Sequence, residues 1–322
     1  MGAKLLGSMI LATAATIGIT TLGIFLIGEI FGGIPILLAL LFAIGLVIFQ
    51  WIIAPKIIQY AFGLIPAEKA GLGWLIESAE KIAKRTGMKK SPEVYVSPSP
   101  IANAFAFGNV FSGKKVAVTK GLLNILSEDE VEAVIAHELG HIRHKDIEIM
   151  MALSVLPAIF YLLARWLYYA SFFRGVTRGR GSERLVLPLV AALAFFFYFV
   201  VSIFMLWVSR LREYYADQNA VESVEGGGIR LARALAKLEY YNSQVITQIR
   251  PEKSIIAFKF LMISDPERKI PRYPVSNVDE LVYQLASKEI TFSESISEIF
   301  RSHPLTPKRI RRLLKLSGII VK

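Results

Sequence analysis

Two long apolar blocks open the chain. Residues 5–27 and residues 34–54 contain no charged side chain, and only residues 28–33 separate them. A membrane-spanning helix needs about 20 mainly apolar residues, and each block meets that length. We therefore predict a transmembrane hairpin over residues 1–54.

Two more apolar blocks lie near the middle of the chain. Residues 149–173 are interrupted by Pro157 and Arg165, whereas residues 185–208 carry no charge. The short stretch between these two blocks contains four arginines. We predict a second pair of apolar membrane helices within residues 149–208.

The remaining segments are polar and carry shorter patterns. Residues 92–98 and 114–121 are β-branched or aromatic runs bounded by Pro, Lys or Gly, which indicates strands. A helix is predicted to begin after Ser127, where Glu130 three residues later completes a capping box. The apolar residues that follow have helical spacing: Val131, Val134, Ile135, Leu139 and Ile142.

These patterns predict a mainly α integral membrane protein with four apolar helices and a polar α+β part with a small sheet. The chain is 54% apolar and carries a net charge of +11. This positive charge fits either nucleic acid or an anionic membrane surface as the partner of the chain. The apolar blocks favour the lipid bilayer, because the cytoplasmic flanks of spanning helices are rich in Lys and Arg. There is no cysteine, so disulfides and thiolate metal sites are excluded.

Candidate chemistry lies in the predicted helix, where residues 134–147 read VIAHELGHIRHKDI. His137 and His141 are four residues apart, so both can direct an imidazole nitrogen at one zinc ion. Glu138 lies beside that face and can contact a water molecule as a general base. The alternative is a helix with two surface histidines, but the chain has only four histidines in all.

A catalytic zinc site needs a third protein ligand. His144 is excluded because it lies about 10.5 Å along the helix axis from His137, and we expect it to be solvated. Glu213 follows the fourth apolar block, and Asp217 shares its helical face. We predict Glu213 as the ligand and Asp217 as the acceptor that fixes a ligand histidine. A solvated acidic pair at a membrane boundary is the alternative.

The sequence HELGH, followed after two apolar segments by REYYAD, resembles the HtpX-type membrane-bound heat-shock endopeptidases, relatives of the CAAX prenyl proteases. The resemblance covers essentially the whole chain. It implies a zincin-like α+β protease domain in two parts, with the zinc-binding helix in residues 55–148 and the third ligand in residues 209–322. It also implies one Zn²⁺ per chain and hydrolysis of peptide bonds in misfolded or damaged membrane proteins.

The segment PIANAFAFGN adds to this resemblance. It is similar to the family's Asn-Ala-Phe-Ala segment, an edge strand that pairs with the substrate backbone. The match implies an exposed strand in which Asn103, Ala104 and Ala106 bind substrate. Phe107 stands where the family more usually has a small hydroxyl residue.

The segment SHPLTPKRIRRL resembles the family's His-Pro motif, in which an arginine follows the histidine by six residues. The match implies catalytic roles for His303 and Arg309, such as stabilising the oxyanion. A structural histidine in a Pro-bounded loop is the alternative for His303. The basic run at the end of this segment is expected to be a solvated helix face.

Charge also bears on membrane placement. Lysines are frequent in residues 55–148, so the positive-inside rule places the protease domain of this multi-pass protein in the cytoplasm. The four-arginine stretch then faces outward if both middle blocks span, against the same rule. We expect full or near-full spanning of the cell membrane, and a partly inserted hairpin is the alternative.

Three other functions are compatible with parts of this pattern. A specific processing protease of the CAAX prenyl protease type has the same chemistry. A membrane metal transporter has the same ligand types, although the charged first turn of the predicted helix argues against an intramembrane site. A non-catalytic membrane scaffold is the third, although no catalytic position is missing.

Overall fold

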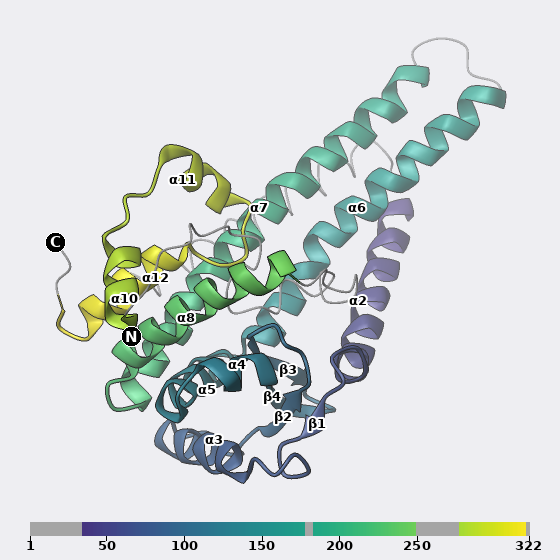
Figure 1. Ribbon diagram of the computed structural model, residues 1–322. Coiled ribbons are helices and arrows are strands. Elements are labelled where there is room, and N and C mark those ends of the chain that lie inside the picture. Colours follow the sequence, from purple (N-terminus) through teal and green to yellow (C-terminus); the bar gives the residue numbers. More distant parts are fainter. Residues whose placement is uncertain (1–33, 178–182, 249–276, 320–322) are drawn as a thin grey trace. The chain divides into compact units, whose positions relative to one another are not determined.

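The computed structural model describes residues 34–177, 183–248 and 277–319 (Figure 1). The apolar block predicted at residues 5–27 lies outside these ranges. The chain divides into two compact units. One contains Ile52–Ile147 and Arg210–Lys322, and the other contains the segments that adjoin them in the sequence, Gly2–Trp51 and Glu148–Ser209.

The first unit contains a four-stranded mixed sheet in the order β1-β2-β4-β3. Its strands are β1 (Ile65–Pro66), β2 (Glu93–Ser97), β3 (Ala104–Asn109) and β4 (Gly113–Thr119). β2 and β4 pair in parallel, and the other two pairings are antiparallel. The strands predicted at residues 92–98 and 114–121 are β2 and β4, and β3 forms one edge of the sheet.

Helices complete the first unit (Figure 1). They are α3 (Gly73–Arg85), α4 (Lys120–Ile125), α5 (Glu128–Arg143), α8 (Gly227–Gln248), α10 (Val278–Ser287), α11 (Phe292–Ile299) and α12 (Thr306–Leu316). Buried residues of α3, α5, α8, α10 and α12 form one apolar core with the sheet. Burial of this continuous apolar surface is the main force that holds the first unit together.

Helix α5 forms as its sequence predicts. Ser127 and Glu130 make the predicted capping box, with the Ser127 N–H donating to the Glu130 carboxylate at 2.9 Å. This box satisfies N–H groups that would otherwise lack a partner at the helix start. The predicted apolar residues of α5 are all buried in the core.

Long apolar helices make up the described part of the second unit. They are α2 (Ile34–Ala61), α6 (Asp146–Thr177) and α7 (Glu183–Ser223), whose ends belong to the first unit. α6 and α7 pack side by side, for example through the rings of Phe160 and Phe197, whose centroids are 5.4 Å apart. Both helices are long and apolar enough to cross a membrane.

Three of the four predicted apolar blocks therefore coincide with described helices. Pro157 lies inside α6 without ending it, although proline removes a backbone hydrogen bond within a helix. α7 continues to Ser223, well past the end of the apolar block at residue 208. The acidic residues Glu213 and Asp217 consequently lie on the same helix as the fourth block.

Candidate metal centre

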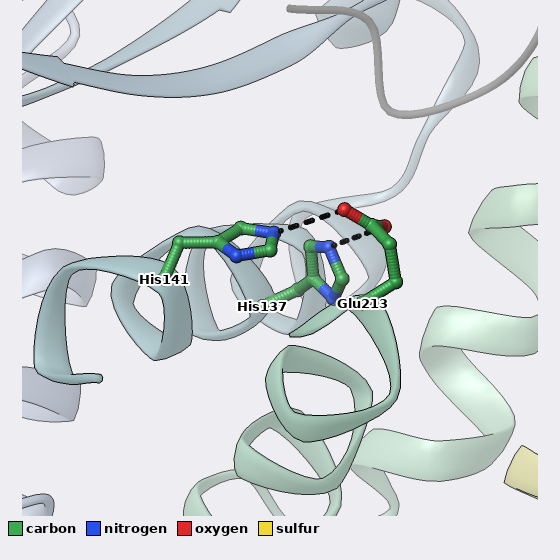
Figure 2. Close-up of side chains that lie close together, drawn as sticks. All are labelled: His137, His141 and Glu213. Atoms are coloured by element: carbon green, nitrogen blue, oxygen red, sulfur yellow. Dashed lines mark ion pairs between the residues drawn. The ribbon is translucent and has the colours of Figure 1, made fainter. Parts of the chain in front are cut away.

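Three side chains of the first unit converge on one point (Figure 2). His137 and His141 project from successive turns of α5, and Glu213 approaches from α7. His137 Nε2 lies 3.6 Å from one Glu213 oxygen, and His141 Nε2 lies 3.4 Å from the other. We call these three residues the metal-site cluster.

The metal-site cluster fits a divalent cation. Its ligand atoms all lie within 4.8 Å of one another, so the three residues could hold one ion. Two ligands bound to a tetrahedral zinc ion at about 2.0–2.1 Å lie about 3.4 Å apart, close to the observed separations. Two imidazoles and one carboxylate are also a donor set that catalytic zinc uses.

A buried carboxylate contacts the other ring nitrogen of each histidine. Asp217 Oδ1 lies 3.0 Å from His137 Nδ1, and Asp146 Oδ2 lies 2.6 Å from His141 Nδ1. Such partners fix the tautomer and the orientation of a ligating imidazole. Arg212 lies 3.0 Å from the second oxygen of Asp146 and balances its charge.

The contact of Asp146 with His141 is not among the features that the sequence predicts. Asp146 follows Lys145, which adopts a left-handed backbone conformation with φ of 56° between α5 and α6. Non-glycine residues rarely adopt this conformation. Asp146, the next residue, contacts His141 in the last turn of α5, and helical periodicity does not predict this contact. The sequence signal that could have indicated this partner is an acidic residue directly after the helix that carries the two histidines.

His144 is not fully solvated, contrary to the expectation. It is half-buried, with its ring 5.6 Å from that of Tyr215. Burial lowers the pKa of His144 below its ordinary value. The last turn of α5 packs against α7, so the end of this helix does not face water on all sides. His144 remains outside the metal-site cluster, as the spacing along the helix predicts.

Close packing between α5 and α7 sets the geometry of the cluster. Gly140 lies so near α7 that an added Cβ would be 2.9 Å from Ala216 Cα. The buried Asn219 donates to the Ala136 carbonyl at 2.7 Å and accepts from Arg143 at 3.0 Å. These contacts hold the helix with both histidines against the helix with Glu213.

The carboxylates also change the protonation of the imidazoles. Burial alone lowers the pKa of His141, but Asp146 and Glu213 outweigh this effect and raise it to about 10. Burial lowers the pKa of His137 too, and Asp217 and Glu213 raise it above its ordinary value. A cation that binds here must displace these protons, so binding releases protons to solvent.

Arg309 is not on a solvated face, contrary to the expectation for the C-terminal basic run. Arg309 is only 1% exposed. Its guanidinium donates two hydrogen bonds to Asp217, from Nη2 at 2.6 Å and from Nε at 3.1 Å. Its Nη1 lies 3.1 Å from Glu213. Two carboxylates therefore surround a cation that would otherwise be costly to bury. The neighbouring Arg311 and Lys315 do face solvent.

The other predicted site residues lie near the cluster or on the sheet edge. His303 Nδ1 is 3.1 Å from Glu213 Oε1, and the side chain is half-buried. Glu138 is buried on α5 directly after His137. Asn103 is buried just before β3, and its backbone N–H and carbonyl both bond to Thr119.

Strand β3 is an edge strand of the sheet, and nearly all of its side chains are buried. Ala104 and Ala106 face the core that contains α5, and Ala104 is fully buried. Phe107 packs on the opposite face, with its ring 5.7 Å from that of Phe105 and 6.0 Å from that of Tyr95. The unusual residue at position 107 is therefore a packing residue on the face turned away from α5.

Comparison with known proteins agrees with this geometry. Residues 70–317 match peptidase family M48, and they include every residue of the metal-site cluster. The chain belongs to peptidase family M48 and is a metallopeptidase.

Relatives match over nearly the whole chain. Protease HtpX homolog 2 of Saccharolobus solfataricus is 33% identical over 94% of this chain and 95% of its own length. Protease HtpX homolog of Aeropyrum pernix is 35% identical over 89% of this chain and 88% of its own. Protease HtpX homolog 1 of Sulfolobus acidocaldarius is 34% identical over 98% of both chains.

A solved structure shares the fold. The crystal structure of S. mikatae Ste24p aligns with a TM-score of 0.54 and 21% sequence identity. The alignment covers 97% of this chain and 66% of that chain. This likeness shows the fold, and in the described part of the chain α6 and α7 have the length and composition of membrane-crossing helices.

Proposed function

We propose that this protein is a zinc-dependent endopeptidase that hydrolyses peptide bonds in misfolded or damaged membrane proteins. The observation that carries the proposal is the metal-site cluster, with Glu138 beside it on α5. Membership of peptidase family M48 supports hydrolysis of polypeptides. The choice of damaged membrane proteins as substrates rests on the resemblance to heat-shock endopeptidases.

His137, His141 and Glu213 would hold the zinc ion and leave one position open for water or substrate. When bound, zinc supplies a Lewis acid that acidifies water and polarises a carbonyl group. Asp146 is placed to accept a hydrogen bond from His141 Nδ1–H, and Asp217 lies 3.0 Å from His137 Nδ1, so both carboxylates favour an Nε2 lone pair that points at the cluster.

Glu138 acts as the general base in this proposal. It takes a proton from the water that attacks the peptide carbonyl and then returns the proton to the leaving amine. Its place directly after His137 puts it beside the ligands without making it one of them. Its burial keeps competing bulk water away from the carboxylate.

His303 and Arg309 have different roles in the proposal. His303 is partly accessible and lies 3.1 Å from Glu213, so it is placed to donate a hydrogen bond to the oxyanion. Arg309 is enclosed by Asp217 and Glu213, so it positions these carboxylates and does not contact substrate.

The edge of β3 offers a place for an extended substrate. A peptide can add to a sheet edge through main-chain hydrogen bonds. The buried Asn103 fixes the start of this edge through Thr119 of β4. In this proposal Asn103, Ala104 and Ala106 hold the substrate through the backbone, since their side chains are turned into the protein or toward α5.

We further propose a multi-pass arrangement in the cell membrane with the first unit in the cytoplasm. The lysines of residues 55–148 support this orientation. A metal transporter is less well supported. The cluster lies in the first unit, outside the apolar blocks, and Glu128 and Asp129 in the first turn of α5 are exposed.

The test is cleavage of an unfolded model polypeptide by the purified chain in detergent. We expect cleavage that a chelator abolishes and added zinc restores. Persistence of full cleavage after complete metal removal would contradict the proposal. Zinc flux into sealed vesicles without peptide cleavage would favour the transporter.

A further inference from the structure

Helix α11 turns its apolar face outward. Phe292, Ile296, Ile299 and the following Phe300 are 82%, 43%, 39% and 55% exposed. These residues are spaced i, i+4, i+7 and i+8, so they share one side of the helix. We call them the α11 stripe.

The opposite side of α11 is acidic, and its residue Glu298 is buried against the protein. Glu298 accepts the Leu305 N–H at 3.0 Å and pairs with Lys308. Glu294 pairs with Lys288 at 2.7 Å. A helix on the water-exposed surface of a protein normally buries its apolar stripe and exposes its charges. α11 does the reverse, which indicates that its outer surroundings are apolar.

The C-terminal end of α11 is tied to a particular turn of α7. Arg210 Nη1 donates to the carbonyl oxygens of Glu298 at 2.9 Å, Ile299 at 3.1 Å and Arg301 at 2.7 Å. Arg210 follows the apolar block of residues 185–208 by two positions. The α11 stripe is therefore anchored at the point where α7 changes from apolar to polar, which is where a spanning helix leaves the bilayer.

We propose that the α11 stripe lies in the bilayer surface, at the boundary between lipid headgroups and acyl chains. The apolar width of the stripe and its anchor on α7 both fit this occupant. α11 itself carries two glutamates and no basic residue, so burial of apolar surface drives the contact. The stripe should therefore insert into zwitterionic as well as anionic bilayers. This proposal does not depend on the catalytic one.

The contact also connects the bilayer to the candidate site. Glu298 holds the backbone of Leu305, two residues after His303. The loop that carries His303 is thus supported by a helix whose outer face meets lipid. The outer face of this supporting helix contacts lipid when the protein is in a bilayer and water when it is not. The support of the His303 loop therefore differs between the two environments.

The test uses the absence of cysteine in the chain. An environment-sensitive fluorophore is attached to Ile296→Cys or, as a second position, to Phe292→Cys. The full chain is reconstituted into phosphatidylcholine vesicles. Quenching by lipids spin-labelled near the headgroup is compared with quenching by aqueous iodide. Glu80→Cys, at an exposed polar position of α3, is the matched control.

We expect lipid quenching and protection from iodide at Ile296 and Phe292, and the opposite at Glu80. Iodide quenching of both stripe labels to the extent seen at Glu80 would overturn the proposal. So would protection from iodide without lipid quenching, which would mean that another part of this chain or a second copy covers the stripe. Protection that requires added unfolded polypeptide would identify a substrate-docking surface and would also overturn the proposal.

Discussion

At the scale of single residues, the two histidines of the metal-site cluster have the same arrangement. Each Nε2 faces Glu213, and each Nδ1 faces a different buried carboxylate, Asp217 or Asp146. These carboxylates lie on different helices, so the two rings are held independently. Loss of either carboxylate should therefore loosen one ring and leave the other in place.

We predict that Asp146→Asn weakens zinc binding by about 10–100-fold, the usual effect of losing an outer partner of a ligand. The amide oxygen of asparagine still accepts a hydrogen bond from His141. It carries no negative charge, so it no longer stabilises the imidazole electrostatically or neutralises the charge of Arg212. Competition with a chromophoric chelator measures the affinity. Asp129→Asn, at an exposed position of α5, is the control and should bind zinc like the parent. Equal affinities in the two variants would count against the role of Asp146.

A second prediction concerns the third ligand. Glu213→Ala should lose most bound zinc and all cleavage, because two imidazoles alone do not complete a catalytic zinc site. Metal analysis of the purified variant measures the first effect. Glu222→Ala removes an exposed carboxylate from the same helix and should change neither property. Full zinc content in Glu213→Ala protein would rule out this ligand.

All three residues of the metal-site cluster were predicted from the sequence, because helical spacing shows which side chains share a face. The four-residue spacings of His137 with His141 and of Glu213 with Asp217 each define one helix face. The spacing does not show that Asp146, directly after the left-handed Lys145, contacts His141. Nor does it show that Arg309 is buried, because a basic run in a helix is normally solvated.

At the scale of secondary-structure elements, the distance between α5 and α7 determines whether the ligands can meet. Gly140 allows the two helices to approach, and Asn219 joins them through its side-chain amide. Small changes at this contact should therefore alter metal binding without touching a ligand.

We predict that Gly140→Ala lowers both stability and zinc affinity. The new Cβ would lie 2.9 Å from Ala216 Cα, which is backbone and cannot rotate away. Overpacking typically costs about 1–3 kcal/mol, more than the roughly 0.5–1 kcal/mol that alanine gains over glycine in a helix. Thermal unfolding and chelator competition measure the two effects. Gly73→Ala meets no atom within 4 Å and should be tolerated. A more stable Gly140→Ala protein would contradict the packing argument.

The elements themselves were predictable to different degrees. β2, β4 and the start of α5 carry local signals, namely short β-branched runs and a capping box. β3 is alanine- and phenylalanine-rich, so only the family resemblance indicated a strand there. The end of α7 at Ser223 does not follow from the end of its apolar block, because a change from apolar to polar residues marks a change of surroundings and does not by itself end a helix.

At the scale of the whole molecule, polar segments alternate with long apolar segments along the chain. The unit with the metal-site cluster is assembled from two polar segments, and the intervening sequence forms long apolar helices. The hydrophobic pattern predicts this alternation because spanning length and charge content are properties of the sequence alone. The direction in which the polar unit faces depends instead on the balance of basic residues between the loops.

Single-cysteine labelling tests the proposed orientation. Val110→Cys, at an exposed position in the turn between β3 and β4, should react with an impermeant thiol reagent only after cell lysis. Gly179→Cys reports on the four-arginine stretch and should react from outside if both middle blocks span. Labelling of Val110→Cys in intact cells would contradict a cytoplasmic first unit. Labelling at Gly179 only after lysis would favour a partly inserted hairpin.

The most direct test of the account is metal content and cleavage measured together in the Glu138→Gln variant. The amide keeps the size of the side chain but cannot accept a proton from water at neutral pH. We predict zinc content equal to that of the parent and a loss of cleavage of at least about 10²–10⁴-fold, the usual contribution of general acid–base catalysis. His137→Ala, as the comparison, should lose both zinc and cleavage. Loss of zinc from Glu138→Gln would make Glu138 a ligand, and full activity with zinc retained would contradict a hydrolytic site at this cluster.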